Sequence, residues 1–195
     1  PRNPQGALAG VGWIGCHERS TMLARLYQFS EKRLFWLAVA GYFFLMEIIA
    51  LIYQYALDYY PCALCVQVRA WIWGAVITAL ITAFMHGSFW LRWAGLTLTG
   101  AFLAGGLYTS WYAWGVERGT VISSCTMGAG FPEFMPLDQW IPFLFQADGF
   151  CGQSPPMLFG LSMVETLLIT IGLPLLALLA VWLMNFKGMF QHAGN

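Results

Sequence analysis

Four long apolar segments constrain the fold of this chain more than any other feature. They cover approximately residues 34–57, 62–85, 90–114 and 164–184. Each is long enough to cross the roughly 30 Å hydrocarbon core of a bilayer, which takes about 20 helical residues. None shows the alternation of a spanning strand, and only helices or closed barrels satisfy the backbone in lipid. We therefore predict an all-α membrane protein, a bundle of four transmembrane helices.

The composition agrees with a membrane protein and argues against a nucleic-acid partner. Of the 195 residues, 59% are hydrophobic, 17% aromatic and only 9% charged, which is far from the averages of soluble domains. The formal net charge is zero and the basic residues are too scattered to follow a phosphate backbone, so nucleic acid is not an expected partner. The first segment is too long for a signal-peptide core and is interpreted as retained.

The links between the predicted spans are unequal. The short "HGS" link predicts a tight hairpin between the second and third spans, whereas residues 115–163 form a long outer loop rich in Gly and Pro. Its stretch "FPEFMPLDQWIPFLF" is apolar but too short and too broken by proline to span. We predict that it lies in the interface as a short amphipathic helix. Alternatively, it packs over the bundle as a lid, and the two arrangements are compatible.

Basic residues are concentrated on one side of the predicted bundle. Six flank the predicted spans on the side of the N-terminus, whereas Arg118 alone flanks them on the opposite side. The positive-inside rule then places both termini in the cytoplasm and the 115–163 loop outside. The six are Arg19, Arg25, Lys32, Arg33, Arg92 and Lys187.

This topology places four of the five cysteines on the outer side. Cys62 and Cys65 form a C-x-x-C pair at the mouth of the second span, and Cys125 and Cys151 lie in the outer loop, where disulfides can form. Zinc needs four converging ligands, but the loop cysteines are far apart in sequence and no His lies on the outer side. We therefore expect no metal, while purely structural disulfides stay open as an alternative.

The C-x-x-C pair has the features of a reactive site. Pro61 favours a helix start, which places Cys62 and Cys65 in the first turn, where unpaired amides and the helix dipole stabilise a thiolate. Arg69 follows Cys65 by four residues and lies one turn deeper on the same face. A permanent cation at that depth is costly unless it has a partner. Arg69 either snorkels to the interface or bends inward to pair with Glu47 of the first span.

A dithiol that is oxidised repeatedly at a membrane surface needs an electron acceptor. The sequence has no C-x-x-C-H motif for haem attachment. The acceptor natural to this location is a lipid-soluble quinone, whose ring we expect near Cys65 and Arg69. A cation there would stabilise reduced oxygen, and a thiolate would attack or donate.

Three segments together resemble the disulfide bond formation protein B (DsbB) family of inner-membrane thiol:quinone oxidoreductases. "PCALCVQVR" has P-C-x-L-C followed by Arg, "SSCTMGAGFPEFMPLDQWIPFLFQADGFC" has FPE-x-x-PLD-x-W-x-P between two cysteines, and "FGL" precedes the last span. The resemblance covers about residues 22–186, so we expect 22–195 to form one membrane domain. Val68 departs from the family, which often has an acid there. Where some members place a histidine near the quinone, this chain has "SWYAWG", which makes Tyr112 and Trp114 weaker candidates for quinone contacts.

The resemblance also implies a reaction path through two disulfides, Cys62–Cys65 and Cys125–Cys151. Cys125 would form a mixed disulfide with a periplasmic DsbA-like thioredoxin-fold protein, and Cys151 would then attack the helix-mouth pair to give a transient Cys62–Cys151 bond. Cys65, released beside Arg69, would pass electrons to ubiquinone or menaquinone. Such a chain of thiol exchanges needs no metal. The implied location is the bacterial inner membrane, with cytoplasmic termini and periplasmic cysteine pairs.

Two other function classes are alternatives. Vitamin K epoxide reductase-like enzymes place the active C-x-x-C after the loop cysteines, the reverse of the order here. A membrane scaffold with structural disulfides would leave Arg69 and the C-x-x-C spacing unexplained. Residues 1–21 have no counterpart in the family and are treated as an N-terminal extension of doubtful status, in which Cys16 is expected to be incidental. The sequence does not determine the quinone, the breadth of the partner or the oligomeric state.

Overall fold

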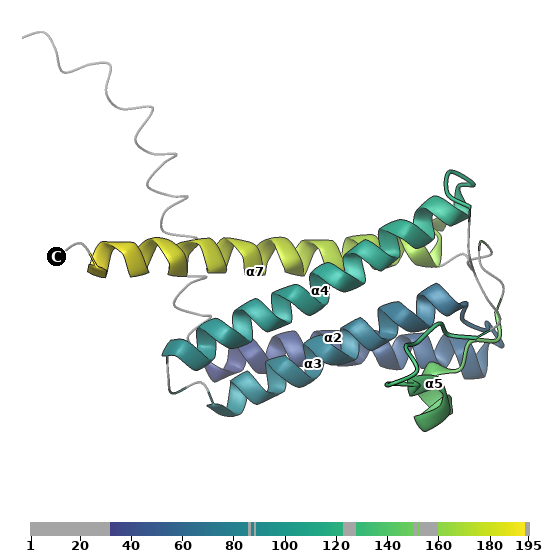
Figure 1. Cartoon of the computed structure of the whole chain (residues 1–195), viewed down its shortest axis with the longest axis horizontal. Helices are drawn as coiled ribbons and strands as arrows, with labels where there is room; N and C mark the ends of the chain where they lie inside the picture. Colours follow the sequence, from purple (N-terminus) through teal and green to yellow (C-terminus); the bar gives the residue numbers. More distant parts are fainter. Residues whose placement is uncertain are drawn as a thin grey trace, which may run out of the picture.

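The part of the chain that the structure describes folds into four long helices and two short ones (Figure 1). The computed structural model describes residues 32–85, 87, 89–122, 128–149, 152 and 160–193, without the side chains of Phe89 and residues 186–193. Cys16, Cys125, Cys151 and the 1–21 extension lie outside the described residues. The described part contains no strand. Its helices are α2 (Arg33–Ala56), α3 (Ala63–Met85), α4 (Phe89–Glu117), α5 (Leu137–Trp140), α6 (Pro142–Phe145) and α7 (Met163–Ala193).

The long helices occur where the apolar segments predict them. The bounds of α2 and α3 agree with the predicted segments to within one residue, and α4 contains the whole of the predicted 90–114. The link between α3 and α4 is short, as predicted, because α3 ends at Met85 and α4 begins at Phe89. α7 starts as predicted but continues beyond residue 184. The sequence therefore located these elements correctly and underestimated the length of the last helix.

Three of the long helices are long and apolar enough to cross a membrane, namely α2, α3 and the Met163–Asn185 part of α7. Their outer faces expose large apolar side chains such as Phe44, Phe84 and Leu173, which a soluble protein would not leave in contiguous patches. The chain is therefore a membrane protein. The prediction of four spans is confirmed for these three helices, and α4 is a helix that is less apolar.

The helices pack in chain order around one core. α3 lies between α2 and α4, and α4 packs in turn against α7 (Figure 1). Gly95 and Gly105 of α4 allow the close approach of α3 and α4. A Cβ at Gly95 would clash with Thr82, and one at Gly105 would lie 2.8 Å from the Trp71 ring. Gly100 differs, because nothing lies within 4 Å of a Cβ added there. The largest fully buried core side chains are Trp36, Phe43, Leu103 and Ile171.

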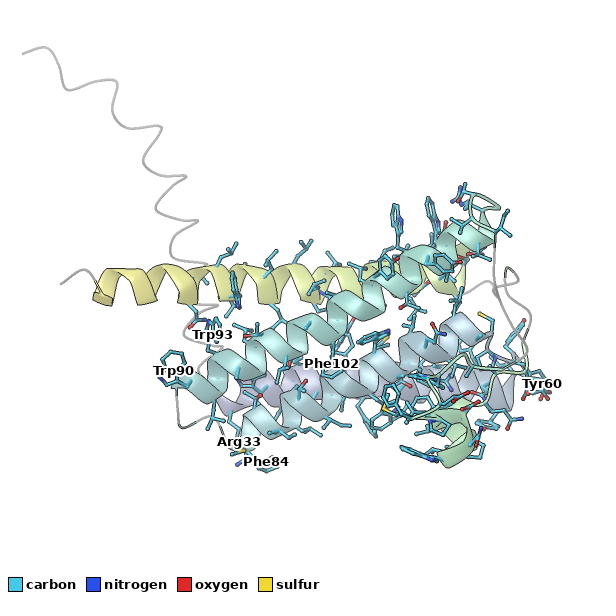
Figure 2. The ribbon with its side chains drawn as sticks, viewed as in Figure 1. Arg33, Tyr60, Phe84, Trp90, Trp93 and Phe102 are labelled. Carbon is cyan, nitrogen blue, oxygen red and sulfur yellow. The ribbon has the colours of Figure 1, made fainter. Side chains whose placement is uncertain are left out.

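The bundle has two distinct ends. Arg33, Phe84 and Trp90 lie together at one end, and Tyr60 lies at the other (Figure 2). The Arg33 guanidinium stands over the Phe84 ring at 4.6 Å from its centroid. We call the end that carries Tyr60 and the C-x-x-C pair the cysteine end.

The described part of the long loop packs against α3 at the cysteine end. Phe145 of α6 is buried together with Val66 of α3 and Ala129 of the loop. Gln67 of α3 donates a hydrogen bond to the Ala129 carbonyl at 3.0 Å. Trp140 remains exposed on the other side of this segment. The loop therefore forms a packed cover, as one of the two sequence interpretations proposed, and it also presents an aromatic surface.

Candidate functional site

Cys62 occupies the N-cap position of α3. The Cys62 carbonyl accepts the hydrogen bond of the Val66 amide at 3.1 Å, and helical residues begin at Ala63. Pro61, which cannot donate a backbone hydrogen bond, precedes this helix start. The Cys62 and Cys65 sulfur atoms are 3.2 Å apart, one helical turn from each other, and both cysteines are half-buried. A short rotation of the side chains would bring them to the roughly 2.05 Å of a disulfide bond.

The position of Cys62 favours its thiolate. The hydrogen bond with the Cys65 side chain is the largest cause that lowers the pKa of Cys62 to about 6. Burial acts in the opposite direction, and the backbone amides of Leu64 and Cys65 lower the pKa further. Unpaired amides at a helix N-terminus stabilise negative charge in this way. A large part of Cys62 is therefore ionised and nucleophilic near neutral pH.

Arg69 pairs inward and does not snorkel to the interface. Its Nη1 donates to Gln54 Oε1 at 2.8 Å and to the Leu144 carbonyl at 2.7 Å. Its Nε lies 3.4 Å from Glu47 Oε2, and the two side chains are 4% and 3% exposed. Of the two alternatives left by the sequence, pairing with Glu47 is the one observed. Arg69 thus joins α3, α2 and α6 in a single buried polar network.

A small cavity opens between α2, α3 and α7 beside this network. Its volume is about 50 Å³, and Cys65, Arg69 and Glu47 all line it. From α7, Thr166 and Thr170 contribute to the wall. Glu47 Oε2 is buried without a hydrogen-bond partner among the described residues. A thiol, a cation and the carboxylate paired with that cation therefore meet in one largely apolar pocket.

The polar groups of this cavity fit the head group of a quinone, whose two oxygens need a cation or hydrogen-bond partners. The volume of the cavity limits what can enter it. A buried apolar cavity that binds a ring as small as benzene has a volume of about 150 Å³. At about 50 Å³ the pocket admits only part of a ring until side chains of α2 and α7 move apart. The chemistry of the site therefore fits the head group, and its present size does not admit the whole of it.

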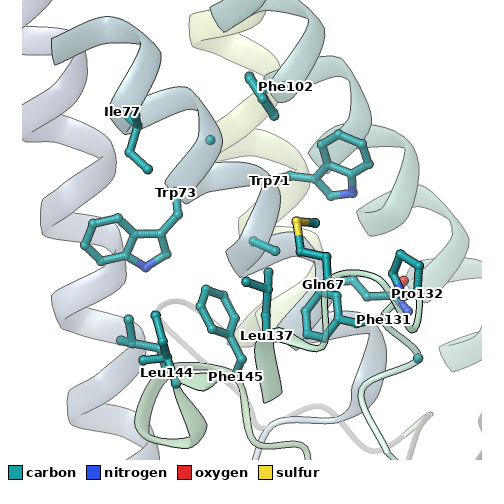
Figure 3. Close-up of a pocket in the computed structure, with 15 residues that line it drawn as sticks. Gln67, Trp71, Trp73, Ile77, Phe102, Phe131, Pro132, Leu137, Leu144 and Phe145 are labelled. Atoms are coloured by element: carbon teal, nitrogen blue, oxygen red, sulfur yellow. The ribbon is translucent and has the colours of Figure 1, made fainter. Parts of the chain in front are cut away.

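A larger cavity lies on the opposite face of α3 (Figure 3). It has a volume of about 670 Å³, and Trp71, Trp73, Phe102 and Phe145 surround it. Gln67, which also lines it, is already bonded to the Ala129 carbonyl. Neither a thiol nor a charged group lines this cavity. Of these two cavities, the smaller one is therefore the one that touches the C-x-x-C pair.

Tyr112 and Trp114 lie near Cys62 but do not line the small cavity. Both pack with Cys62 against the buried Leu64, Ala113 and Val164. Trp114 Nε1 donates to Glu165 Oε1 at 3.4 Å, and the Arg118 guanidinium stands 5.0 Å from the Trp114 ring centroid. Their predicted role in quinone binding stays a prediction.

Gly149 connects the long loop to the start of α3. Its amide donates to the Pro61 carbonyl at 3.0 Å, and Gly149 and Cys62 form an isolated parallel β-bridge. Sequence reasoning missed this residue, and it also missed Gln54 and Leu144 as partners of Arg69. A glutamine inside an apolar helix was a visible signal for Gln54. Leu144 and Gly149 act through backbone atoms, which leave no recognisable side-chain pattern.

Comparison with known proteins identifies the family. The family model "Disulfide bond formation protein DsbB" matches residues 32–183. Disulfide bond formation protein B of Haemophilus influenzae strain 86-028NP is 35% identical over 166 residues, covering 78% of this chain and 86% of that protein. Disulfide bond formation protein B of Shewanella denitrificans is 29% identical and covers 82% of this chain and 93% of its own. The C-x-x-C pair, the buried arginine and these matches together show that the chain belongs to the DsbB family and is a membrane oxidoreductase of disulfide bond formation.

Proposed function

We propose that this protein is a thiol:quinone oxidoreductase that reoxidises a periplasmic DsbA-like dithiol oxidase and passes the electrons to a membrane quinone. The observation that carries the proposal is the small cavity in which Cys65, Arg69 and Glu47 meet within the membrane-spanning helices. A structural disulfide would need neither the buried arginine nor the cavity. Family membership supports the same reading.

The four cysteines divide the reaction into thiol exchanges. A thiolate of the reduced donor attacks the Cys125–Cys151 disulfide at Cys125, and the donor leaves oxidised while the loop pair becomes a dithiol. Cys151 then attacks Cys62, so that Cys65 leaves as a thiolate beside Arg69. Each exchange breaks one S–S bond and forms another, with the thiolate fraction and the leaving group setting its rate. The low pKa of Cys62, about 6, suits it to be the leaving group when Cys125 attacks Cys151 in the Cys62–Cys151 bond and re-forms the loop disulfide.

In the proposed site, the quinone supplies the driving force by accepting two electrons and two protons when bound. Arg69 would orient the head group and stabilise negative charge on its oxygen. Glu47, which lines the same pocket and lies 3.4 Å from Arg69 Nε, would hold a proton there. Gln54 and the Leu144 carbonyl keep the guanidinium in place at 2.8 and 2.7 Å. Ubiquinone and menaquinone both fit this donor set.

We also propose that α4 is the fourth span and that the cysteine end faces the periplasm. The hydroxyls of Thr109 and Ser110 bond to carbonyls of their own helix at 3.0 and 2.8 Å, so their cost in lipid is small. Arg33 and Arg92 lie at the other end, as expected for a cytoplasmic side. The exposed Trp140 of α5 supports contact of the loop with the interface of the bacterial inner membrane.

The test mixes the purified protein with a reduced DsbA-type protein and a soluble quinone and follows quinone reduction by its ultraviolet absorbance. We expect the wild type to turn over, Cys65→Ser to be inactive and Cys16→Ser to behave as the wild type. A wild type that reduces no quinone, or a Cys65→Ser variant with the wild-type rate, would overturn the proposal.

A further inference from the structure

The contact between Gly149 and the start of α3 is made entirely by backbone atoms. The Gly149 amide donates to the Pro61 carbonyl at 3.0 Å, and the isolated bridge pairs Gly149 with Cys62. The partner residues belong to the turn that immediately precedes the C-x-x-C pair. The loop is therefore fixed to the helix start at the Cys62 backbone.

Only glycine fits at this contact. A Cβ at position 149 would clash with the Tyr60 carbonyl oxygen and would lie 3.0 Å from the Pro61 carbonyl carbon. Both obstacles are backbone atoms that lead directly into the N-cap of α3, so they cannot rotate away as a flexible side chain would. An alanine must push the two backbone segments apart, which weakens the amide hydrogen bond.

We infer that Gly149 is a positioning residue for the exchange between the loop cysteines and the C-x-x-C pair, because it fixes the loop backbone at Cys62. This inference rests on the proposed function. Cys151 follows Gly149 by two residues in the sequence, and two residues span at most about 7 Å of extended chain. A disulfide needs Cα atoms about 4.4–6.8 Å apart. The backbone contact therefore fixes the chain at Cys62 only two residues before Cys151 in the sequence.

The step that depends on this contact is one thiol–disulfide exchange. The Cys151 thiolate attacks the Cys62 sulfur, the Cys62–Cys65 bond breaks, the Cys62–Cys151 bond forms and Cys65 leaves as a thiolate. The number of disulfides is unchanged, so the exchange itself needs no external oxidant. A displacement of about 1 Å is enough to slow such an oriented attack strongly.

The experiment compares two electron donors. In the first arm, the full chain with or without Gly149→Ala receives a reduced DsbA-type protein, so electrons must pass from the loop pair to the C-x-x-C pair. In the second arm, a Cys125→Ser/Cys151→Ser background with or without Gly149→Ala receives dithiothreitol, which reduces Cys62–Cys65 directly. Quinone reduction is the readout in both arms.

We expect Gly149→Ala to slow the first arm by about tenfold or more and to leave the second within about twofold. Two controls match the substitution. Gly100→Ala adds a Cβ where nothing lies within 4 Å, and Gln146→Ala removes an exposed side chain from the same loop segment. Both should retain wild-type rates in the first arm.

The outcomes separate the two claims. Equal first-arm rates for Gly149→Ala and the wild type overturn the role of Gly149 and leave the proposed function intact. An equal loss in both arms also overturns it, because the residue would then act on the fold of the C-x-x-C pair. Absence of quinone reduction in the second arm with Gly149 in place overturns the proposed function, and the inference falls with it.

Discussion

The Arg69 guanidinium on α3 donates a hydrogen bond of 2.7 Å to the backbone carbonyl of Leu144, a residue 75 positions further along the chain. The same nitrogen donates to Gln54, and Nε faces Glu47 across 3.4 Å. One side chain thus connects the wall of the small cavity to the loop segment that carries α6. Occupancy of the cavity and the position of the loop are therefore expected to influence each other.

Arg69→Met should raise the KM for quinone by roughly 10- to 100-fold, the equivalent of losing about 1.5–3 kcal/mol from hydrogen bonds to a charged group. Methionine retains much of the volume while removing the charge. Initial rates at varied quinone concentration measure the change. The matched control is Tyr55→Phe, which removes the 2.8 Å hydrogen bond to the Phe143 carbonyl and leaves the ring stacking on Phe143. If Tyr55→Phe raised the KM equally, the effect would belong to loop docking and not to the cavity.

The reduced protein should show a nucleophilic Cys62 at unusually low pH. In a variant in which Cys16, Cys125 and Cys151 are replaced by serine, the alkylation rate of Cys62 should be half-maximal at about pH 6. Because the pKa is lowered, the thiolate persists at neutral pH, and the rate falls about tenfold per pH unit only below that midpoint. Mass spectrometry after timed quenching gives the rate.

Cys65→Ala supplies the control for this pH profile. It removes the hydrogen bond that contributes most to the low pKa, so the midpoint should move upward toward the roughly 8.5 of an ordinary thiol. The ordinary pKa of a free cysteine is about 8.5. A midpoint near that value in both proteins would show that the helix start does not stabilise the thiolate.

Cysteine labelling should show that α4 crosses the membrane. Trp90 and Trp111 are both exposed and lie near opposite ends of α4. In a cysteine-free background, an impermeant maleimide added to intact spheroplasts should label Trp111→Cys and should reach Trp90→Cys only after permeabilisation. Labelling of both positions from the same side would contradict the fourth span.

Close packing of α3 and α4 should make Gly95 sensitive to the smallest substitution. A Cβ there would clash with Thr82, so Gly95→Ala is expected to destabilise the fold by about 1–3 kcal/mol. Gly100→Ala should be nearly neutral, because nothing lies within 4 Å of a Cβ added at that position of the same helix. Thermal unfolding in detergent, followed by circular dichroism, compares the two. Equal stability of both variants would mean that the helices separate easily at Gly95.

The helices were predictable because length and apolar character are local properties of the sequence. The start of α3 followed from Pro61, and the tight hairpin followed from the short polar link before residue 89. The extension of α7 beyond residue 184 was not predictable from hydropathy. Hydropathy indicates how many residues can lie within the lipid. A helix can continue beyond the lipid into water wherever its backbone hydrogen bonds are satisfied.

The candidate site was predictable in its cysteines and arginine but not in their surroundings. C-x-x-C and an arginine one turn deeper form a short-range pattern that the sequence displays directly. The partners of Arg69 come from α2 and α6, which only the fold brings beside it. Glu47 was recognised as a possible partner, yet its distance along the membrane normal could not be judged without the packing of α2 against α3.

The backbone contact at Gly149 has an unequal consequence for mutational tolerance on its two sides. On the side of α3, Tyr60 and Pro61 contribute only carbonyl groups, and the Tyr60 side chain points away and is 59% exposed. Position 60 should therefore accept many side chains in a saturation library, while position 149 should accept glycine alone. Sequence variation at this junction is therefore expected on the segment before α3, whereas the loop segment is restricted to glycine.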